Sequence, residues 1–140
     1  KEALKLAEDI LGKLTRTPGP RHPTTLAASD NLAQTLRAAG DAAGAEGVYR
    51  EALAHLRPPG QEPEHELPQL GSVLYQLADV LREQGKLEEA RQRAEESVAA
   101  YERHPAWPES PRQHAPRVLE QVLKELGEQS DQPVKEPSRE

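Results

Sequence analysis

A spaced internal repeat constrains the fold of this chain more than any other feature. Residues 31–45 read NLAQTLRAAGDAAGA, and residues 76–90 read QLADVLREQGKLEEA. The two copies carry identical residues 45 positions apart, at Leu32/Leu77, Ala33/Ala78, Leu36/Leu81, Arg37/Arg82, Gly40/Gly85 and Ala45/Ala90. A period in the range of about 20–50 residues, built from two helical patterns around a glycine, is typical of stacked helical repeats. The sequence therefore predicts an all-α solenoid of antiparallel helix pairs with about six helices.

The apolar periodicity sets the positions of these helices. It predicts helices over residues 2–14, 23–39, 41–56, 67–84, 86–103 and 113–127. Pro23 and Pro68 suit the first helical position, where a missing N–H costs nothing. Gly40 and Gly85 are predicted to end their helices in the left-handed conformation, and Gly127 is predicted to end the last helix. The proline-rich segments 57–66 and 104–111 are interpreted as breaks between helix pairs.

We interpret the chain as five segments. Residues 1–14 form the second helix of a truncated repeat, 23–57 and 67–103 form two complete repeats, 113–127 form a C-terminal capping helix, and the polar residues 128–140 are expected to be disordered. The absence of a starting Met and the incomplete first repeat lead us to expect a piece of a longer protein.

The first helix is expected to leave an apolar face open, at Leu4, Ala7, Leu11 and Leu14. Exposed apolar surfaces of this kind tend to find partners. We expect a second copy of the chain to cover this face, or upstream repeats in a parent chain.

Composition excludes several classes of function. The chain has no Phe, Met or Cys, and its formal net charge is −6. A net acidic chain is not expected to bind nucleic acid. Neither a membrane-spanning segment nor a signal peptide is visible, so no membrane association is expected. The lack of Cys excludes disulfides and thiolate metal sites and favours an intracellular, cytoplasmic protein.

These residues resemble the tetratricopeptide repeat. The family pattern has a large–small pair, a large residue four positions after the first, and a glycine that closes helix A, as at Leu32-Ala33, Leu36 and Gly40. Helix B continues with Ala45, Tyr49 and Ala52-Leu53. The spacing of 42–45 residues most resembles the longer repeats of kinesin light chains. The resemblance covers residues 2–127 and implies a right-handed solenoid that binds proteins.

The resemblance also implies where a partner would bind. Helix A lines the inside of the solenoid, and its polar residues face an extended groove. The candidate partner-binding residues are Asn31, Gln34, Arg37, Tyr75, Gln76, Asp79, Arg82, Arg117 and Gln121, with Asp30 and Lys124 beside them. The amides of Asn31 and Gln76 suit the backbone of an extended peptide, and Arg37 and Arg82 are expected to receive successive acidic side chains. The alternative is that these are solvated polar positions.

Other chemistry is not indicated. Some family members clamp a C-terminal carboxylate with Lys and Asn, but Asp30 and Tyr75 occupy those positions here. The five His residues lack metal-ligand spacing, and Glu64-His65-Glu66 lies in a loop unsuited to a metal. No nucleophile or phosphate loop is visible. We therefore predict a non-enzymatic scaffold or adaptor without cofactors that captures a peptide or helical segment. The alternative is a regulatory or sensory arm of a larger ATPase or protease.

Overall fold

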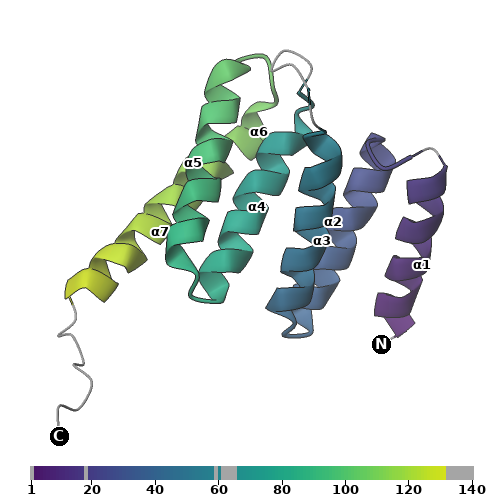
Figure 1. The fold of residues 1–140 in the computed structure, drawn as a ribbon, viewed down its shortest axis with the longest axis horizontal. Coiled ribbons are helices and arrows are strands. Elements are labelled where there is room, and N and C mark those ends of the chain that lie inside the picture. The colour runs from purple at the N-terminus through teal and green to yellow at the C-terminus, as the bar shows by residue number, and fades with distance from the viewer. Residues whose placement is uncertain (1, 18, 59, 61–65, 132–140) are drawn as a thin grey trace, which may run out of the picture.

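A computed structural model describes residues 2–17, 19–58, 60 and 66–131. The helices are α1 (Glu2–Arg16), α2 (Pro23–Ala38), α3 (Ala42–Leu56), α4 (Gln69–Glu83), α5 (Leu87–Arg103), α6 (Glu109–Arg112) and α7 (His114–Asp131), and these described parts contain no strand. Helices α1 to α5 follow one another along the molecule, and α7 runs obliquely across the end of the row, where it contacts α5 and α4 (Figure 1). The chain is a right-handed α-solenoid of antiparallel helix pairs, as predicted. No helix in these ranges is long and apolar enough to cross a membrane.

Several helix ends differ from the predicted ones by one or two residues, and two regions differ more. Pro23 is the first residue of α2, as predicted, but Pro68 is not the first residue of α4, because it occupies the N-cap position before Gln69. The one-turn helix α6 overlaps the end of segment 104–111, which was predicted as a break. The predicted end at Gly127 is wrong, because α7 continues to Asp131. Gly127 is not among the glycines with a positive φ, and the following Glu128 and Gln129 are good helix formers. Of the predicted tail, residues 132–140 lie outside the described part of the chain.

Each helix pair is connected by one turn, and the two turns have a glycine at the equivalent position. Gly40 and Gly85 have φ values of 83° and 80°, which a residue with a β-carbon adopts only at a cost. The next N–H groups, those of Asp41 and Lys86, donate to the carbonyls of Leu36 and Leu81 at 2.8 and 2.9 Å. These bonds satisfy carbonyls at the helix end. The predicted left-handed caps are confirmed, and they fold α3 back on α2 and α5 back on α4.

Small residues allow the paired helices to approach closely. Ala33, Ala45, Ala78 and Ala90 are fully buried. In the second pair, a β-carbon added at Gly71 would lie 2.5 Å from the ring of Tyr101, and the Ser97 hydroxyl donates to the Gly71 carbonyl at 2.7 Å. The core therefore runs as a continuous layer between the helices.

The first helix has an open apolar face, but its residues are partly different from those predicted. Leu4, Leu11 and Leu14 are half-buried, whereas the side chains of Leu6 and Ile10 are 60% and 44% exposed. Helix α1 is rotated so that Leu11 and Leu14 are half-buried, whereas Leu6 and Ile10 lie at the more open edge of its contact with α2.

Candidate functional site

Helices α2, α4 and α7 form one continuous face of the solenoid, which we call the α2–α4–α7 face. Along it α2 contacts α4, and α4 contacts α7. The first helix of each repeat supplies this face. The predicted partner-binding residues all come from these three helices.

A cluster of four polar residues joins α2, α3 and α4, and we call it the Asp30 cluster. The Tyr49 hydroxyl lies 2.7 Å from both Asp30 Oδ1 and Gln76 Oε1. Gln34 Nε2 donates to Gln76 Oε1 at 3.1 Å and to the Tyr49 oxygen at 3.2 Å. A hydroxyl carries one proton, so the Tyr49 hydroxyl serves one of its two acceptors at a time. The cluster is therefore rich in acceptors.

The surroundings keep Tyr49 in its protonated, donating form. Burial raises the pKa of Tyr49 far above its ordinary value, and the adjacent Asp30 carboxylate raises it further. The ring is fully buried, and only the hydroxyl reaches the α2–α4–α7 face. Through this hydrogen bond, Tyr49 fixes the position of the Asp30 carboxylate from the buried side of the face.

Farther along the same face, ion pairs link α2, α4 and α7 in a chain that we call the arginine ladder. Arg37 donates to Asp79 at 2.9 Å and to Glu83 at 2.6 Å. Arg82 pairs with Asp79 at 2.8 Å and with Glu125 at 3.1 Å. The hydrogen bond with Glu83 raises the pKa of Arg37, which outweighs the lowering effect of partial burial. Both predicted arginines therefore already hold two carboxylates each.

A pocket of about 310 Å³ opens between α2 and α4, beside the Asp30 cluster. Leu26 and Val73 are buried apolar residues of its lining, and Ala52 of α3 closes it below. Asp30, Gln76 and the half-buried ring of Tyr75 line it as well. A volume of this size accommodates one large side chain of a partner with room for water.

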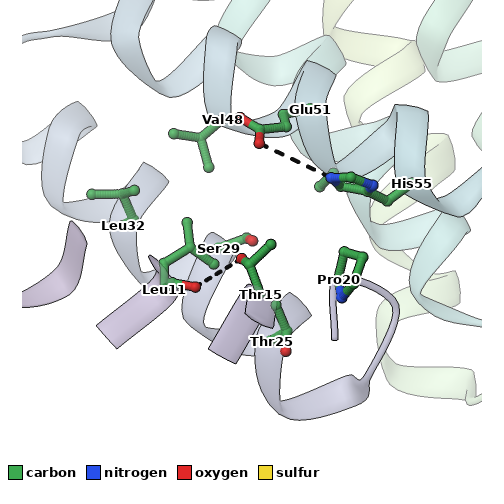
Figure 2. A pocket seen from close by; sticks show the side chains of 10 residues that line it. Leu11, Thr15, Pro20, Thr25, Ser29, Leu32, Val48, Glu51 and His55 are labelled. Atoms are coloured by element: carbon green, nitrogen blue, oxygen red, sulfur yellow. Dashed lines mark hydrogen bonds and ion pairs between the residues drawn. The ribbon is translucent and has the colours of Figure 1, made fainter. Parts of the chain in front are cut away.

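Two other hollows are less suited to a partner segment. A hollow of about 90 Å³ lies where α1, α2 and α3 meet. Figure 2 shows its mixed lining, which includes Leu11, Thr15 and His55. The hollow suits a few water molecules rather than a side chain of a partner. A third, apolar hollow of about 220 Å³ lies between α1 and α2, and Asn31 lines it with Leu6 and Ile10.

The structure brings most of the predicted site residues together. Gln34 and Gln76 meet in the Asp30 cluster, and Arg37, Asp79 and Arg82 form the arginine ladder. Gln121 reaches the ladder by donating to Glu125 at 2.6 Å. Tyr75 faces the pocket, with its ring centroid 5.5 Å from that of His114. Asn31 and Arg117 are exposed and lie apart from both clusters.

The predicted set did not include three residues that shape this face, Tyr49, Glu83 and Glu125. Tyr49 has the spacing of a core residue, and nothing in the sequence shows that its hydroxyl emerges on the other side. Glu83 and Glu125 follow the ladder arginines by 46 and 43 residues, close to the 42–45-residue repeat spacing. That spacing is the signal that could have found them.

Comparison with known families identifies the fold. Sequence models described as tetratricopeptide repeat match residues 1–57 and 70–104. The chain belongs to the tetratricopeptide-repeat family. The matched ranges contain α1 to α3 and α4 to α5, so the two repeats and the preceding helix are covered. A comparison with curated proteins gave no match.

Repeats of this family generally mediate contacts between proteins. Among the residues that the structure describes, no group of three or more His, Asp or Glu residues is placed to hold a metal ion. Glu64 and His65, whose loop is expected to be unsuited to a metal, lie outside the described residues, and the neighbouring Glu66 contacts Arg103 and His104.

Proposed function

We propose that the protein is an interaction scaffold that captures an extended peptide or a helical segment of a partner on its α2–α4–α7 face. The observation that carries this proposal is the pocket between α2 and α4. It combines a buried apolar lining with amide and carboxylate groups at its wall, which is the composition of sites that bind apolar side chains with defined orientation. Gln76 offers both donor and acceptor atoms to a peptide backbone.

The spacing of the repeats supports a closer placement within the family. Equivalent residues are 42–45 positions apart, which is the longer spacing of kinesin light chain-like repeats. We therefore propose adaptor function in the cytoplasm, in which the solenoid joins a bound segment to other proteins without chemical change.

A peptide selection tests this function. Random peptides of about 12 residues, long enough to span the face in extended form, are displayed on phage and selected on the 140-residue chain. The affinity of the enriched peptides is then measured by fluorescence anisotropy. Ala27 is exposed and lines the pocket, so Ala27→Phe fills it. Ala54 is exposed on α3, and Ala54→Phe is the matched control.

We expect Ala27→Phe to weaken binding by about tenfold or more, since it excludes the anchoring side chain, and Ala54→Phe to leave the affinity unchanged. A peptide that tolerates Ala27→Phe would move the site elsewhere. Enrichment no higher than that on a bare support would reject the proposed function.

We also propose that a second copy covers the open face of α1. The register equivalents of Ala3, Ala7 and Ile10 in α3 are Ala45, Tyr49 and Ala52, and all three are buried by neighbouring helices. In α1, Ala3 and Ile10 are exposed and Ala7 is half-buried, and the exposed Leu6 lies beside them. Alanines four residues apart allow two such helices to pack closely about a two-fold axis, the commonest symmetry of protein dimers.

Sedimentation equilibrium of variants tests this self-association. We expect the wild-type chain to form dimers and Leu6→Asp to shift it to the monomer. Ala54→Asp introduces the same charge at an exposed position of α3 and is expected to remain dimeric. A wild-type chain that stays monomeric at high concentration would contradict this second proposal.

A further inference from the structure

The two clusters on the α2–α4–α7 face differ in how their charges are compensated. In the arginine ladder, Asp79, Glu83 and Glu125 each lie within 3.1 Å of a guanidinium group. Within the described residues, the Asp30 carboxylate has no Lys, Arg or His nitrogen within 4.0 Å. Its recorded contacts are with the Tyr49 hydroxyl and the Gln34 amide, both to Oδ1. Asp30 therefore keeps its negative charge and accepting capacity available beside the pocket.

The surroundings of Asp30 suit a long side chain that ends in a positive charge. Leu26 and Val73 offer apolar surface to an aliphatic stem, as Lys and Arg side chains require when they are partly buried. The Tyr75 ring in the same pocket attracts a cation through its π face. The carboxylate is held in place by Tyr49, so little ordering is needed when a cation binds.

From this arrangement we infer that the pocket recognises a Lys or Arg side chain of the partner, and that Asp30 is its counter-ion. The inference rests on the proposed function and specifies its partner as a basic peptide segment. The net charge of −6 adds long-range attraction for such a segment. The pocket then sets the position at which the segment docks.

The same geometry argues against the acidic partner expected from Arg37 and Arg82. In the arginine ladder three carboxylates surround two guanidinium groups. An acidic side chain that approached either arginine would meet like charges and would have to displace an existing partner. Like-charge contacts of this kind disfavour a partner strongly. The ladder therefore stabilises the stacking of the repeats, and the Asp30 pocket selects the ligand.

A double-mutant cycle on the selected peptides tests the inference. We expect the enriched peptides to share a Lys or Arg next to an apolar residue. Asp30→Asn keeps an oxygen for the Tyr49 hydroxyl but removes the charge. It is expected to weaken binding about tenfold, because charge-assisted hydrogen bonds are the strong ones. Glu102→Gln makes the same charge change at an exposed position of α5 and is expected to have no effect.

The second arm of the cycle replaces the basic residue of the peptide by norleucine, which keeps the stem and removes the charge. We expect this peptide to bind wild type and Asp30→Asn equally. We also expect the affinity of wild type for the basic peptide to fall between about 0.05 and 0.5 M NaCl, more steeply than that of Asp30→Asn, since salt screens the pair. Far-UV circular dichroism of both variants verifies that the fold is intact.

The outcomes separate this inference from the proposed function. Enriched peptides without Lys or Arg, or basic peptides that bind Asp30→Asn as tightly as wild type, would overturn the inference. If those peptides still lost affinity with Ala27→Phe, the proposed function would stand. The absence of any enriched peptide would instead reject the proposed function itself.

Discussion

The α2–α4–α7 face has a pocket half, which contains the Asp30 cluster, and a ladder half, which contains the arginine ladder. Both halves use α2 and α4, but α3 completes the pocket half and α7 completes the ladder half. In the ladder half, Arg37 of α2 pairs with two carboxylates of α4, and Arg82 of α4 pairs with Asp79 of its own helix and with Glu125 of α7. In the pocket half, the Tyr49 hydroxyl contacts Asp30, and a pocket of about 310 Å³ lies beside the Asp30 carboxylate.

This difference shows how one solenoid face can combine stability with binding. Where long charged side chains bridge consecutive repeats, their hydrogen-bonding groups are occupied and a ligand gains little. In the pocket half, the short side chain of Asp30 and the buried ring of Tyr49 do not bridge the repeats in this way. A pocket therefore remains, and the Asp30 carboxylate can still accept hydrogen bonds from a ligand. A polar residue on this face is therefore a binding candidate only if its neighbours in the next repeat leave it free.

We expect the largest loss of stability when the Tyr49 hydroxyl, which supports the pocket half, is removed. Tyr49→Phe removes the buried hydroxyl that lies 2.7 Å from both Asp30 and Gln76 and leaves only the Gln34 amide, among the described residues, as a donor to them. We expect it to lower the free energy of unfolding by about 1–2 kcal/mol. Urea denaturation followed by circular dichroism measures this change. Tyr101→Phe is the control, because the Tyr101 hydroxyl meets Ser72 only at 3.4 Å, and we expect about 0.5 kcal/mol or less. Equal losses for both tyrosines would show that the Asp30 cluster adds nothing to stability.

A somewhat smaller effect is expected in the ladder half. Asp79 accepts from both arginines, so Asp79→Asn should lower the free energy of unfolding by about 1 kcal/mol at low salt, and less at high salt because the group is partly exposed. Glu88 pairs with Arg91, but its side chain is 70% exposed, and Glu88→Gln is expected to change stability by less than about 0.5 kcal/mol. A loss for Asp79→Asn that did not depend on salt would argue against the ion-pair account of the ladder.

The pH dependence of stability should reveal the contribution of one ion-paired carboxylate, that of Glu46 in α3. Burial alone would raise the pKa of Glu46, but hydrogen bonds from Lys86, Gln84 and Arg50 outweigh it and lower this pKa from 4.5 to about 2. A carboxyl whose pKa is lower in the folded state stabilises the fold above pH 4.5, and this contribution is lost as the pH falls toward 2. We expect it to be about 1 kcal/mol after solvent screening.

Chemical denaturation of wild type and Glu46→Gln between pH 7 and pH 2 measures this contribution. The difference in stability between the two proteins should be largest at neutral pH and should shrink below about pH 4.5. A difference that stayed constant across this range would contradict the depressed pKa.

The smallest effect is expected at Asn31, which the sequence placed in the binding set. Its side chain is exposed and belongs to neither half of the face. Asn31→Ala should change the free energy of unfolding by less than about 0.5 kcal/mol and should leave the affinity of selected peptides unchanged. A clear loss of peptide affinity would extend the site beyond the pocket toward α1.

The sequence predicted the features that depend on local residue patterns. It did not predict the features that depend on how the helices pack against one another. The helices and the turns at Gly40 and Gly85 follow from residues close in sequence. The meeting of Gln34 with Gln76 follows from the repeat spacing of 42 residues between them. The rotation of α1, which exposes Leu6 rather than Leu14, depends on contacts with α2. The occupation of Arg37 and Arg82 depends on the angle between stacked helices, which no single segment encodes.

Mapping a selected peptide on the chain by NMR tests the central claim most directly. Backbone amide signals are recorded with and without saturating peptide. If the pocket between α2 and α4 is the binding site, the largest shifts should fall on Ala27, Asp30, Ser72 and Gln76, with small changes on the exposed faces of α3 and α5. Shifts concentrated on α5, or on α1 near Leu6, would contradict the claim that this pocket captures the partner.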